Sequence, residues 1–329
     1  MRILITGGAG FIGSHLAERY LQQGDEVYII DDLSTGCTEN MDAIKQPGYE
    51  NRLFFKQGSV LNSDMMLELV GTCDVVFHLA AAVGVQYILD NPLSSIVTNI
   101  QGTEKILELC AKFKKKVMIA STSEVYGKRD PRDNRLFEET DDCIYGPSVK
   151  SRWSYAAAKL MDEFTTLAYH RVKGLPVIVV RLFNTVGPRQ MGRYGMVIPR
   201  FVGQALKNAP ITVYGNGNQT RTFTHIKEVV QCMMSLMEEP KAIGQVVNIG
   251  GSEEISILNL AKRVKEMAQS KSEIVFVPYE QAYPMDFEDM ERRVPSTQKL
   301  KKIIGFAPQA NLHDILSDVI HSFDRGVQP

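Results

Sequence analysis

The sequence predicts an α/β protein with a doubly wound parallel sheet, followed by a smaller α/β lobe. Three observations support this fold class. Short β-branched apolar runs alternate with helical patterns through the first two thirds of the 329 residues. A glycine-rich turn joins the first run to the first helical pattern, and the runs become short and irregular after about residue 190. Alternation of this kind indicates βαβ units and therefore parallel strands.

Five apolar runs predict the strands of the parallel sheet. They are RILIT at 2–6, EVYII at 26–30, DVVFHL at 74–79, KVMIA at 116–120 and PVIVVRL at 176–182. The helical patterns between them occupy 13–23, 94–112 and 154–172. The second helix follows Asn91-Pro92, and proline suits the first turn of a helix because its missing N–H would have no partner there.

The pattern loosens in the last third of the chain. Short strands are expected at 211, 246 and 273, and helices at 255–268 and 312–324. We therefore predict a first lobe over residues 1–190 and a smaller lobe over 191–329, with connections that cross between them more than once.

Composition excludes several classes of function. Lysine and arginine total 37 against 38 aspartate and glutamate, and the basic residues are scattered, so the electrostatic footprint of a nucleic-acid binder is missing. The five cysteines are widely separated and form no metal-binding pattern, which predicts a reducing, cytoplasmic location and no metal. No apolar run approaches the ~18 residues that span a bilayer, and the first strand leaves no room for a signal peptide.

The turn after the first strand, TGGAGFIG at 6–13, predicts a dinucleotide site of the Rossmann type. Gly7 permits the tight turn, Gly10 lets a diphosphate approach the backbone, and Gly13 lets the helix pack against the strand. Phe11 and Ile12 lie between the last two glycines, where the helix begins. Free N–H groups at that helix start attract phosphates.

An acid at the end of the second strand predicts NAD as the cofactor. Asp31 stands 18 residues past Gly13, where a carboxylate meets the ribose hydroxyls and repels the 2′-phosphate of NADP. We expect Asp31 rather than Asp32 to make this contact, with Asp32 a solvated loop residue. Ser59, followed by Val60, is expected beside the adenine.

The pattern YAAAK places Tyr155 and Lys159 four residues apart, and hence on one face of a helix. Lys159 and the nicotinamide charge together would lower the pKa of Tyr155, which would make it a base for a substrate hydroxyl. The segment STSEVYG, at 121–127, ends the preceding parallel strand. YxxxK alone is a common pattern, but its place after the dinucleotide fingerprint and after this segment makes it a strong signal.

These motifs together resemble the extended short-chain dehydrogenases/reductases, the family of sugar-nucleotide epimerases, dehydratases and decarboxylases. The resemblance covers essentially the whole chain. It rests on TGGAGFIGSHL at 6–16, HLAA at 78–81, Asn99, STSEVYG, YAAAK and RLFNTVGPRQ at 181–190.

The resemblance implies a role for each matching position. The cofactor-binding residues would be Gly7, Gly10, Phe11, Ile12, Gly13, Asp31, Ser59, Val60, Leu79, Ala80, Ala81, Asn99, Tyr155 and Lys159. Thr122 would hydrogen-bond the sugar C4 hydroxyl, which Tyr155 and Lys159 oxidise. Asn184 would contact substrate, as would Val213, Tyr214 and Arg221 in the segment TVYGNGNQTRTFTHI at 212–226. Arg221 would grip the diphosphate, whereas His225 is expected to be structural.

The residue at 124 bears on the step after C4 oxidation. Epimerases of the family generally carry a small residue where this chain has Glu124. The 4,6-dehydratases use a glutamate there, commonly after an aspartate, but here Ser123 precedes it. UDP-glucuronate decarboxylases also carry Thr-Ser-Glu. The apiose-forming branch has a cysteine in place of Ser123, so apiose formation is not expected and Cys143 is taken as an ordinary thiol.

Two further segments favour the decarboxylases. KSRWSY at 150–155 resembles their Arg-Trp element, and DMERRVP at 289–295 resembles a late motif whose arginine faces the substrate carboxylate. These matches assign Arg152 and Arg293 to substrate binding and Arg293, with Ser123 and Glu124, to catalysis. Structural ion pairs with Asp289 or Glu291 are the alternative role for the two arginines.

The sequence therefore favours an enzyme that decarboxylates UDP-glucuronate after C4 oxidation, giving a UDP-pentose or UDP-4-keto-pentose. A UDP-sugar 4-epimerase and a 4,6-dehydratase remain alternatives. A redox-sensing regulator that binds NAD would be expected to have lost Tyr155 or Lys159.

The resemblance also implies a homodimer. Helices 94–112 and 154–172 resemble the pair through which members of the family associate. Their apolar positions include Ile100, Ile106, Leu107, Leu160 and Leu167.

Overall fold

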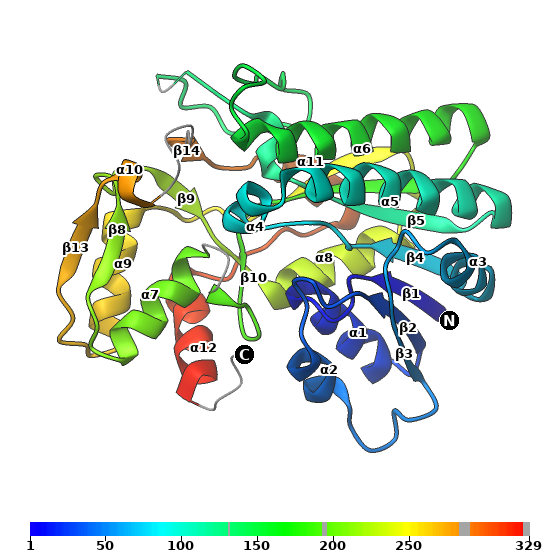
Figure 1. Ribbon diagram of the computed structural model, residues 1–329, viewed down its shortest axis with the longest axis horizontal. Helices are drawn as coiled ribbons and strands as arrows, with labels where there is room; N and C mark the ends of the chain where they lie inside the picture. Colours follow the sequence, from blue (N-terminus) through cyan, green and yellow to red (C-terminus); the bar gives the residue numbers. More distant parts are fainter. Residues whose placement is uncertain (131, 193–195, 283–289, 325–329) are drawn as a thin grey trace.

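The computed structural model describes residues 1–130, 132–192, 196–282 and 290–324. Its centre is a seven-stranded parallel sheet in the order β11-β6-β5-β4-β1-β2-β3 (Figure 1). The strands are β1 (Arg2–Thr6), β2 (Glu26–Asp31), β3 (Leu53–Gln57), β4 (Val75–His78), β5 (Lys116–Thr122), β6 (Val177–Leu182) and β11 (Gln245–Ile249). From β1 the chain order runs outward to β2 and β3 on one side and to β4, β5 and β6 on the other, so the order reverses at β1. Ligands bind at such a switch point, outside the carboxyl ends of the strands.

Helices cover both faces of this sheet, as the doubly wound prediction requires. They are α1 (Phe11–Gln22), α2 (Thr38–Ile44), α3 (Ser63–Thr72), α4 (Val85–Asp90), α5 (Pro92–Phe113), α6 (Arg152–Lys173), α8 (Ile226–Glu238) and α11 (Gln298–Ile304). Ile3 and Ile5 of β1 pack with α1 and α8, whereas Leu4 packs with α3 and α5. Alternate residues of one strand thus enter two separate cores, because successive side chains point to opposite faces.

The remaining elements form the smaller lobe at the left of Figure 1. They are β7 (Thr185–Val186), α7 (Val197–Leu206), β8 (Ile211–Tyr214), β9 (Thr220–Thr222), β10 (Thr224–His225), β12 (Glu254–Ser256), α9 (Ile257–Met267), β13 (Ile274–Val277), α10 (Tyr279–Ala282), β14 (Arg292–Arg293) and α12 (Leu312–Asp324). Short sheets β12-β9-β14, β13-β8 and β10-β7 hold it together. Apolar residues of α7, α9 and α12 pack into its core. None of the described helices is long and apolar enough to cross a membrane.

One strand belongs to a different lobe from the one expected. The run near 246 is β11, and it pairs in parallel with β6 at the edge of the main sheet. A short apolar run identifies a strand but not the sheet that it joins, because parallel pairing is a long-range choice. Residues beyond 190 therefore return to the main sheet, where α8 also packs.

His78, at the end of β4, makes the fold sensitive to acid. Its Nδ1 lies 2.8 Å from Thr6 Oγ1, and burial, followed by the charge of Lys159, lowers the pKa of His78 to about 3. In the folded protein the ring therefore stays neutral between pH 6.5 and about pH 3, whereas in the unfolded chain it takes up a proton in that range.

The stability that neutral His78 contributes is full above pH 6.5 and is lost as the pH falls toward 3. We expect the free energy of unfolding to fall by up to about 1.4 kcal/mol per pH unit in that window for this residue. Denaturant titrations between pH 7 and pH 4 measure the slope. His78→Asn should reduce it, and an unchanged slope in the variant would refute the assignment.

Candidate functional site

A cavity of about 540 Å³ opens at the carboxyl ends of the parallel strands, between the two lobes. Its first-lobe wall includes Gly7 and Asp31, and its second-lobe wall includes Tyr214 and Arg221. This volume suits a small-molecule site. Nowhere in the described part of the chain do three or more potential metal ligands gather.

The glycine-rich turn has the geometry that a dinucleotide needs. Gly7 has φ +72°, and a Cβ there would lie 2.7 Å from the backbone nitrogen of Ala80. A Cβ on Gly13 would lie 2.3 Å from the carbonyl oxygen of Gly7. Gly10 caps the start of α1 and lines the cavity, so the N–H groups of that helix start face the site. These residues fit a diphosphate at the helix N-terminus.

Asp31 lies at the end of β2 on the cavity wall and is only 7% exposed. Its Oδ2 accepts a hydrogen bond from the Ala9 N–H (2.9 Å) and its Oδ1 one from the Leu33 N–H (2.8 Å). Burial raises the pKa of Asp31, and these backbone donors oppose the shift. Asp32 also lines the cavity but is exposed. Asp31 is thus the buried carboxylate of the two, and two backbone N–H groups hold it.

The other proposed cofactor residues divide into two groups. The cavity wall includes Phe11, Ile12, Val60, Leu79, Ala80 and Ala81. Ser59 and Asn99 are not part of this wall as described. The Ser59 hydroxyl accepts a hydrogen bond from the Leu61 N–H, and the buried Asn99 side chain holds both backbone groups of Ala82, which does line the cavity.

The residues expected at the reacting centre converge on the cavity from two elements. Thr122, Ser123 and Glu124 line it at the end of β5, and Tyr155 lines it from α6. Thr122 Oγ1 accepts a hydrogen bond from the Glu124 N–H (3.2 Å), which caps the short 3₁₀ helix that begins at Ser123. The Thr-Ser-Glu segment and the tyrosine therefore line the same cavity.

Lys159 lies one helical turn beyond Tyr155 and is almost fully buried. Its Nζ lies 2.8 Å from Asp162 Oδ2, whose side chain is 1% exposed. Burial raises the pKa of Asp162, and Lys159 opposes this shift. The ammonium is thus paired within its own helix, a contact that the YxxxK pattern did not predict.

Arg293 meets Glu124 across the cavity. The two side chains form an ion pair, and Arg293 Nη2 also donates to Asn184 Oδ1 at 3.1 Å. The Nε of Arg293 is buried and has no hydrogen-bond partner among the described residues. The partner of Arg293 is therefore a residue of the site and not Glu291, the neighbour considered above. Asp289 and the side chain of Arg152 lie outside the described residues.

The second-lobe wall holds the residues expected to bind the nucleotide. Arg221 is buried, lines the cavity and donates to the carbonyl oxygen of Thr220 at 2.8 Å. Tyr214 lines the cavity, but Val213 is wholly buried in the core of the smaller lobe. The two side chains lie on opposite sides of β8, because neighbouring residues of a strand point to opposite sides.

Two cavity arginines were missed by sequence reasoning. The Arg200 guanidinium stacks on the Tyr214 ring, 3.9 Å from its centroid. Arg189, in the segment GPRQ, is 7% exposed and pairs with Glu18 of α1. The resemblance included Arg189 in a motif but gave it no role, and no motif singled out Arg200.

Two other residues behave as the sequence suggested. His225 caps α8 by accepting a hydrogen bond from the Lys227 N–H, and it contacts Asp318, as a structural histidine would. Burial raises the pKa of the Cys143 thiol, which is consistent with an ordinary, protonated cysteine.

The apolar residues of α5 and α6 differ in their exposure to solvent. Ile106 and Leu107 are fully buried inside the first lobe and cannot face another molecule. On α6, Met161 and Phe164 are 50% and 55% exposed, and Val172 near the end of the helix is 77% exposed. The apolar positions of a helix, taken from the sequence alone, do not show which of them face the sheet and which lie on the outer side.

Comparisons with known proteins agree with this geometry. The family model described as GDP-mannose 4,6 dehydratase matches residues 4–319. The UDP-N-acetyl-α-D-glucosaminuronate decarboxylase of Bacillus cytotoxicus is 42% identical, over 98% of this chain and 97% of that protein. UDP-glucuronic acid decarboxylase 1 of Danio rerio is 35% identical, over 99% and 73%.

Solved structures of enzymes with the same fold are also similar. The UDP-glucuronic acid 4-epimerase of Bacillus cereus, solved with UDP-glucuronic acid and NAD, has a TM-score of 0.87 and 30% identity, and the match covers 99% of each chain. The dTDP-glucose 4,6-dehydratase of Streptomyces venezuelae, solved with NAD, has a TM-score of 0.86 and 26% identity, over 99% and 97%. The chain belongs to the GDP-mannose 4,6-dehydratase family of extended short-chain dehydrogenases/reductases.

Proposed function

We propose that this protein is an NAD-dependent decarboxylase of a UDP-uronate, acting through transient oxidation at the sugar C4. The observation that supports this most directly is the placement of Arg293 against Glu124, beside Thr122 and Tyr155 in one cavity. An arginine with a spare buried Nε donor suits a carboxylate. The uronate is UDP-glucuronate or its 2-acetamido counterpart, because relatives named for each decarboxylation cover the chain.

The chemistry follows from the residues on the cavity wall. When bound, NAD supplies reversible two-electron oxidation at C4. Tyr155 takes the proton of the C4 hydroxyl, a transfer favoured by the ammonium of Lys159, and Thr122 hydrogen-bonds the same oxygen. A C4 ketone makes the uronate a β-keto acid, whose carboxylate leaves as CO₂ while its electrons move toward the C4 oxygen. Thr122 and protonated Tyr155 donate hydrogen bonds to that oxygen as its charge develops.

The residues around C5 complete the reaction. Arg293 orients the carboxylate before it leaves. Glu124, directly or through Ser123 or a water molecule, then relays a proton from solvent to C5, which takes the place of the lost CO₂. A 4-epimerase is the second candidate, because a uronate epimerase has the same fold at 30% identity. That reaction would reorient the keto sugar without loss of CO₂.

We expect the purified protein to bind NAD at least tenfold more tightly than NADP, since a 2′-phosphate would face the buried carboxylate of Asp31. Asp31→Ala should bring the ratio of the NADP and NAD dissociation constants closer to one. Asp32→Ala is the matched control and should leave it nearly unchanged. Calorimetric titration with both dinucleotides measures the ratio, and tighter binding of NADP to the wild type would exclude the assignment.

We also propose a homodimer formed through α5 and α6, in which Met161 and Phe164 become covered. Light scattering at micromolar concentration should give twice the chain mass, and Phe164→Lys should shift it toward the monomer because a charge would be buried in an apolar interface. A monomeric mass for the wild type would contradict this arrangement.

The five free cysteines support a cytoplasmic location.

A further inference from the structure

Arg293 enters the cavity from β14, a strand of only two residues. Its register is Arg292 opposite Thr220 and Arg293 opposite Arg221, at the edge of the sheet β12-β9-β14. Because successive strand residues point to opposite sides, Arg292 faces away from the cavity that Arg293 enters. Such a short strand has few backbone contacts of its own to fix the position of Arg293.

The side chain of Arg292 joins β14 to two other segments. Its Nε and Nη2 donate to the two carboxylate oxygens of Glu254, each at 2.9 Å. Its Nη1 donates to the carbonyl oxygens of Asn134 and Arg135, each also at 2.9 Å. Bidentate pairing of a guanidinium with a carboxylate fixes direction as well as distance. Thr220 Oγ1 donates to the same carboxylate at 2.5 Å, so this contact also ties in β9.

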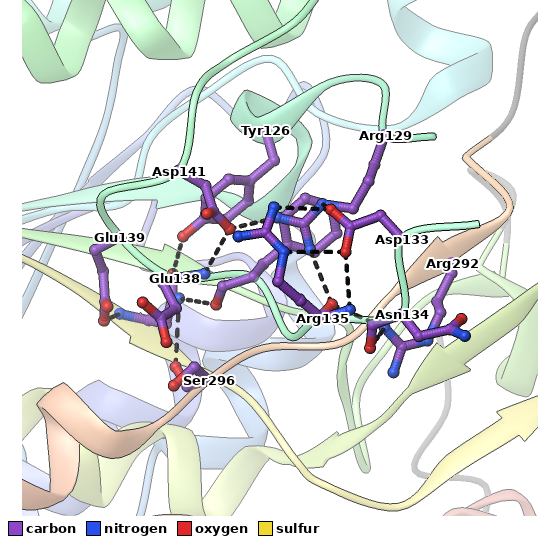
Figure 2. Close-up of polar contacts among 12 residues, drawn as sticks. Tyr126, Arg129, Asp133, Asn134, Arg135, Glu138, Glu139, Asp141, Arg292 and Ser296 are labelled. Carbon is purple, nitrogen blue, oxygen red and sulfur yellow. Dashed lines mark hydrogen bonds and ion pairs between the residues drawn. The ribbon is translucent and has the colours of Figure 1, made fainter. Parts of the chain in front are cut away.

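The two carbonyl groups belong to a segment that is itself well organised. We call residues 129–130 and 132–141 the clamp loop; Figure 2 shows its polar contacts. Arg129, at the start of this loop, makes several of its contacts. Its guanidinium lies 3.7 Å from the centroid of the Phe137 ring, and its Nη1 donates a hydrogen bond of 2.9 Å to the carbonyl oxygen of Arg135. Arg129 also pairs with Asp133 and Asp141.

The clamp loop is also joined directly to the chain that follows β14. The N–H of Phe137 donates to the carbonyl oxygen of Val294, and the N–H of Ser296 donates to that of Phe137, each at 2.8 Å. Backbone bonds on one side and the Arg292 side chain on the other therefore hold the segment that contains Arg293.

We propose that Arg292 is a positioning residue, which with Glu254 and the clamp loop holds Arg293 against Glu124 and the substrate carboxylate. The inference rests on the proposed function, because it assumes a carboxylated sugar in the cavity. Arg292 is not among the residues that line the cavity, so in this proposal it acts through the backbone of β14. Misplacement of a catalytic group by about 1 Å can lower a rate by about 10²-fold, so a rigid support for Arg293 has a measurable effect.

Binding measured without turnover tests this inference. In a Tyr155→Phe background, the ratio of the dissociation constants for UDP-glucose and UDP-glucuronate reports how well Arg293 engages a carboxylate. Arg292→Ala should lower this preference about tenfold while leaving the affinity for UDP within about twofold. Arg292→Lys should give an intermediate value, because an ammonium cannot bridge Glu254 and both carbonyl groups in the same way. Arg132→Ala is the control, since that exposed clamp-loop arginine pairs with Asp130.

A double-mutant cycle separates positioning from general loosening of the fold. In an Arg293→Ala background, Arg292→Ala should change the preference by less than about twofold, because nothing remains to be positioned. The same loss in both backgrounds, or no preference for UDP-glucuronate in the starting protein, would overturn the inference. CO₂ release by the unaltered enzyme is a separate measurement, so failure of the proposed decarboxylation is distinguishable from failure of this positioning role.

Discussion

Tyr155→Phe is expected to lower turnover of the UDP-uronate by roughly 10²-fold or more, the range for loss of a general base. Phenylalanine keeps the ring and its packing but cannot accept the C4 proton, so both C4 oxidation and CO₂ release should fall together. Stopped-flow absorbance of NADH reports C4 oxidation, and CO₂ release measured on the same samples reports decarboxylation. Tyr169→Phe, on the same helix α6, is the matched control and should retain activity.

Substrate affinity completes that test. UDP should bind the Tyr155→Phe protein within about twofold of the wild-type affinity, because the nucleotide residues lie on the opposite lobe. A variant with full activity would remove Tyr155 from the mechanism and with it the proposed C4 oxidation.

Arg293→Ala is expected to lower turnover of a carboxylated substrate by about 10²-fold, since truncating one member of a charge pair at the site costs several kcal/mol and breaks the ion pair with Glu124. The loss should depend on the substrate. Carboxylated UDP-sugars should lose most of their binding advantage over UDP-glucose, whereas binding of UDP itself should persist. Steady-state kinetics and calorimetry on the same preparations measure both effects.

Arg221→Ala provides the contrast to that variant, because it removes the proposed diphosphate contact and should weaken all UDP-sugars alike. Glu124→Gln should leave C4 oxidation in place and slow the later steps at C5. Normal processing of UDP-glucuronate by Arg293→Ala would exclude the carboxylate role.

Local patterns predicted much of the fold, because each of these patterns depends only on residues that are close together in the sequence. The first βα turn needs Gly7 and Gly13 for steric reasons that are visible in the sequence, and the geometry confirms both. Five of the seven parallel strands follow from the same local alternation, whereas β3 was not among the apolar runs from which strands were predicted. The position of β11 was not predictable in this way, since its pairing with β6 joins segments far apart in sequence.

The site divides along the same line. Tyr155 and Thr122 belong to motifs, and both reach the cavity. Resemblance of two motifs assigned both Glu124 and Arg293 to the site, but their ion pair was not predicted. The two residues are 169 positions apart, and periodicity and spacing carry no information about such a contact. The stacking of Arg200 on Tyr214 had no comparable signal, because no sequence pattern links an arginine to a tyrosine 14 residues later.

The central claim is that the carboxylate of a UDP-uronate is lost after C4 oxidation. The direct test is to incubate the wild-type protein and NAD with UDP-glucuronate and, separately, with its 2-acetamido counterpart, and to identify products by mass spectrometry alongside CO₂. The account predicts CO₂ with a UDP-pentose, a UDP-4-keto-pentose or the corresponding 2-acetamido pentose. Conversion of either substrate to a C4-inverted uronate of unchanged mass, without CO₂, would contradict it and establish the epimerase instead.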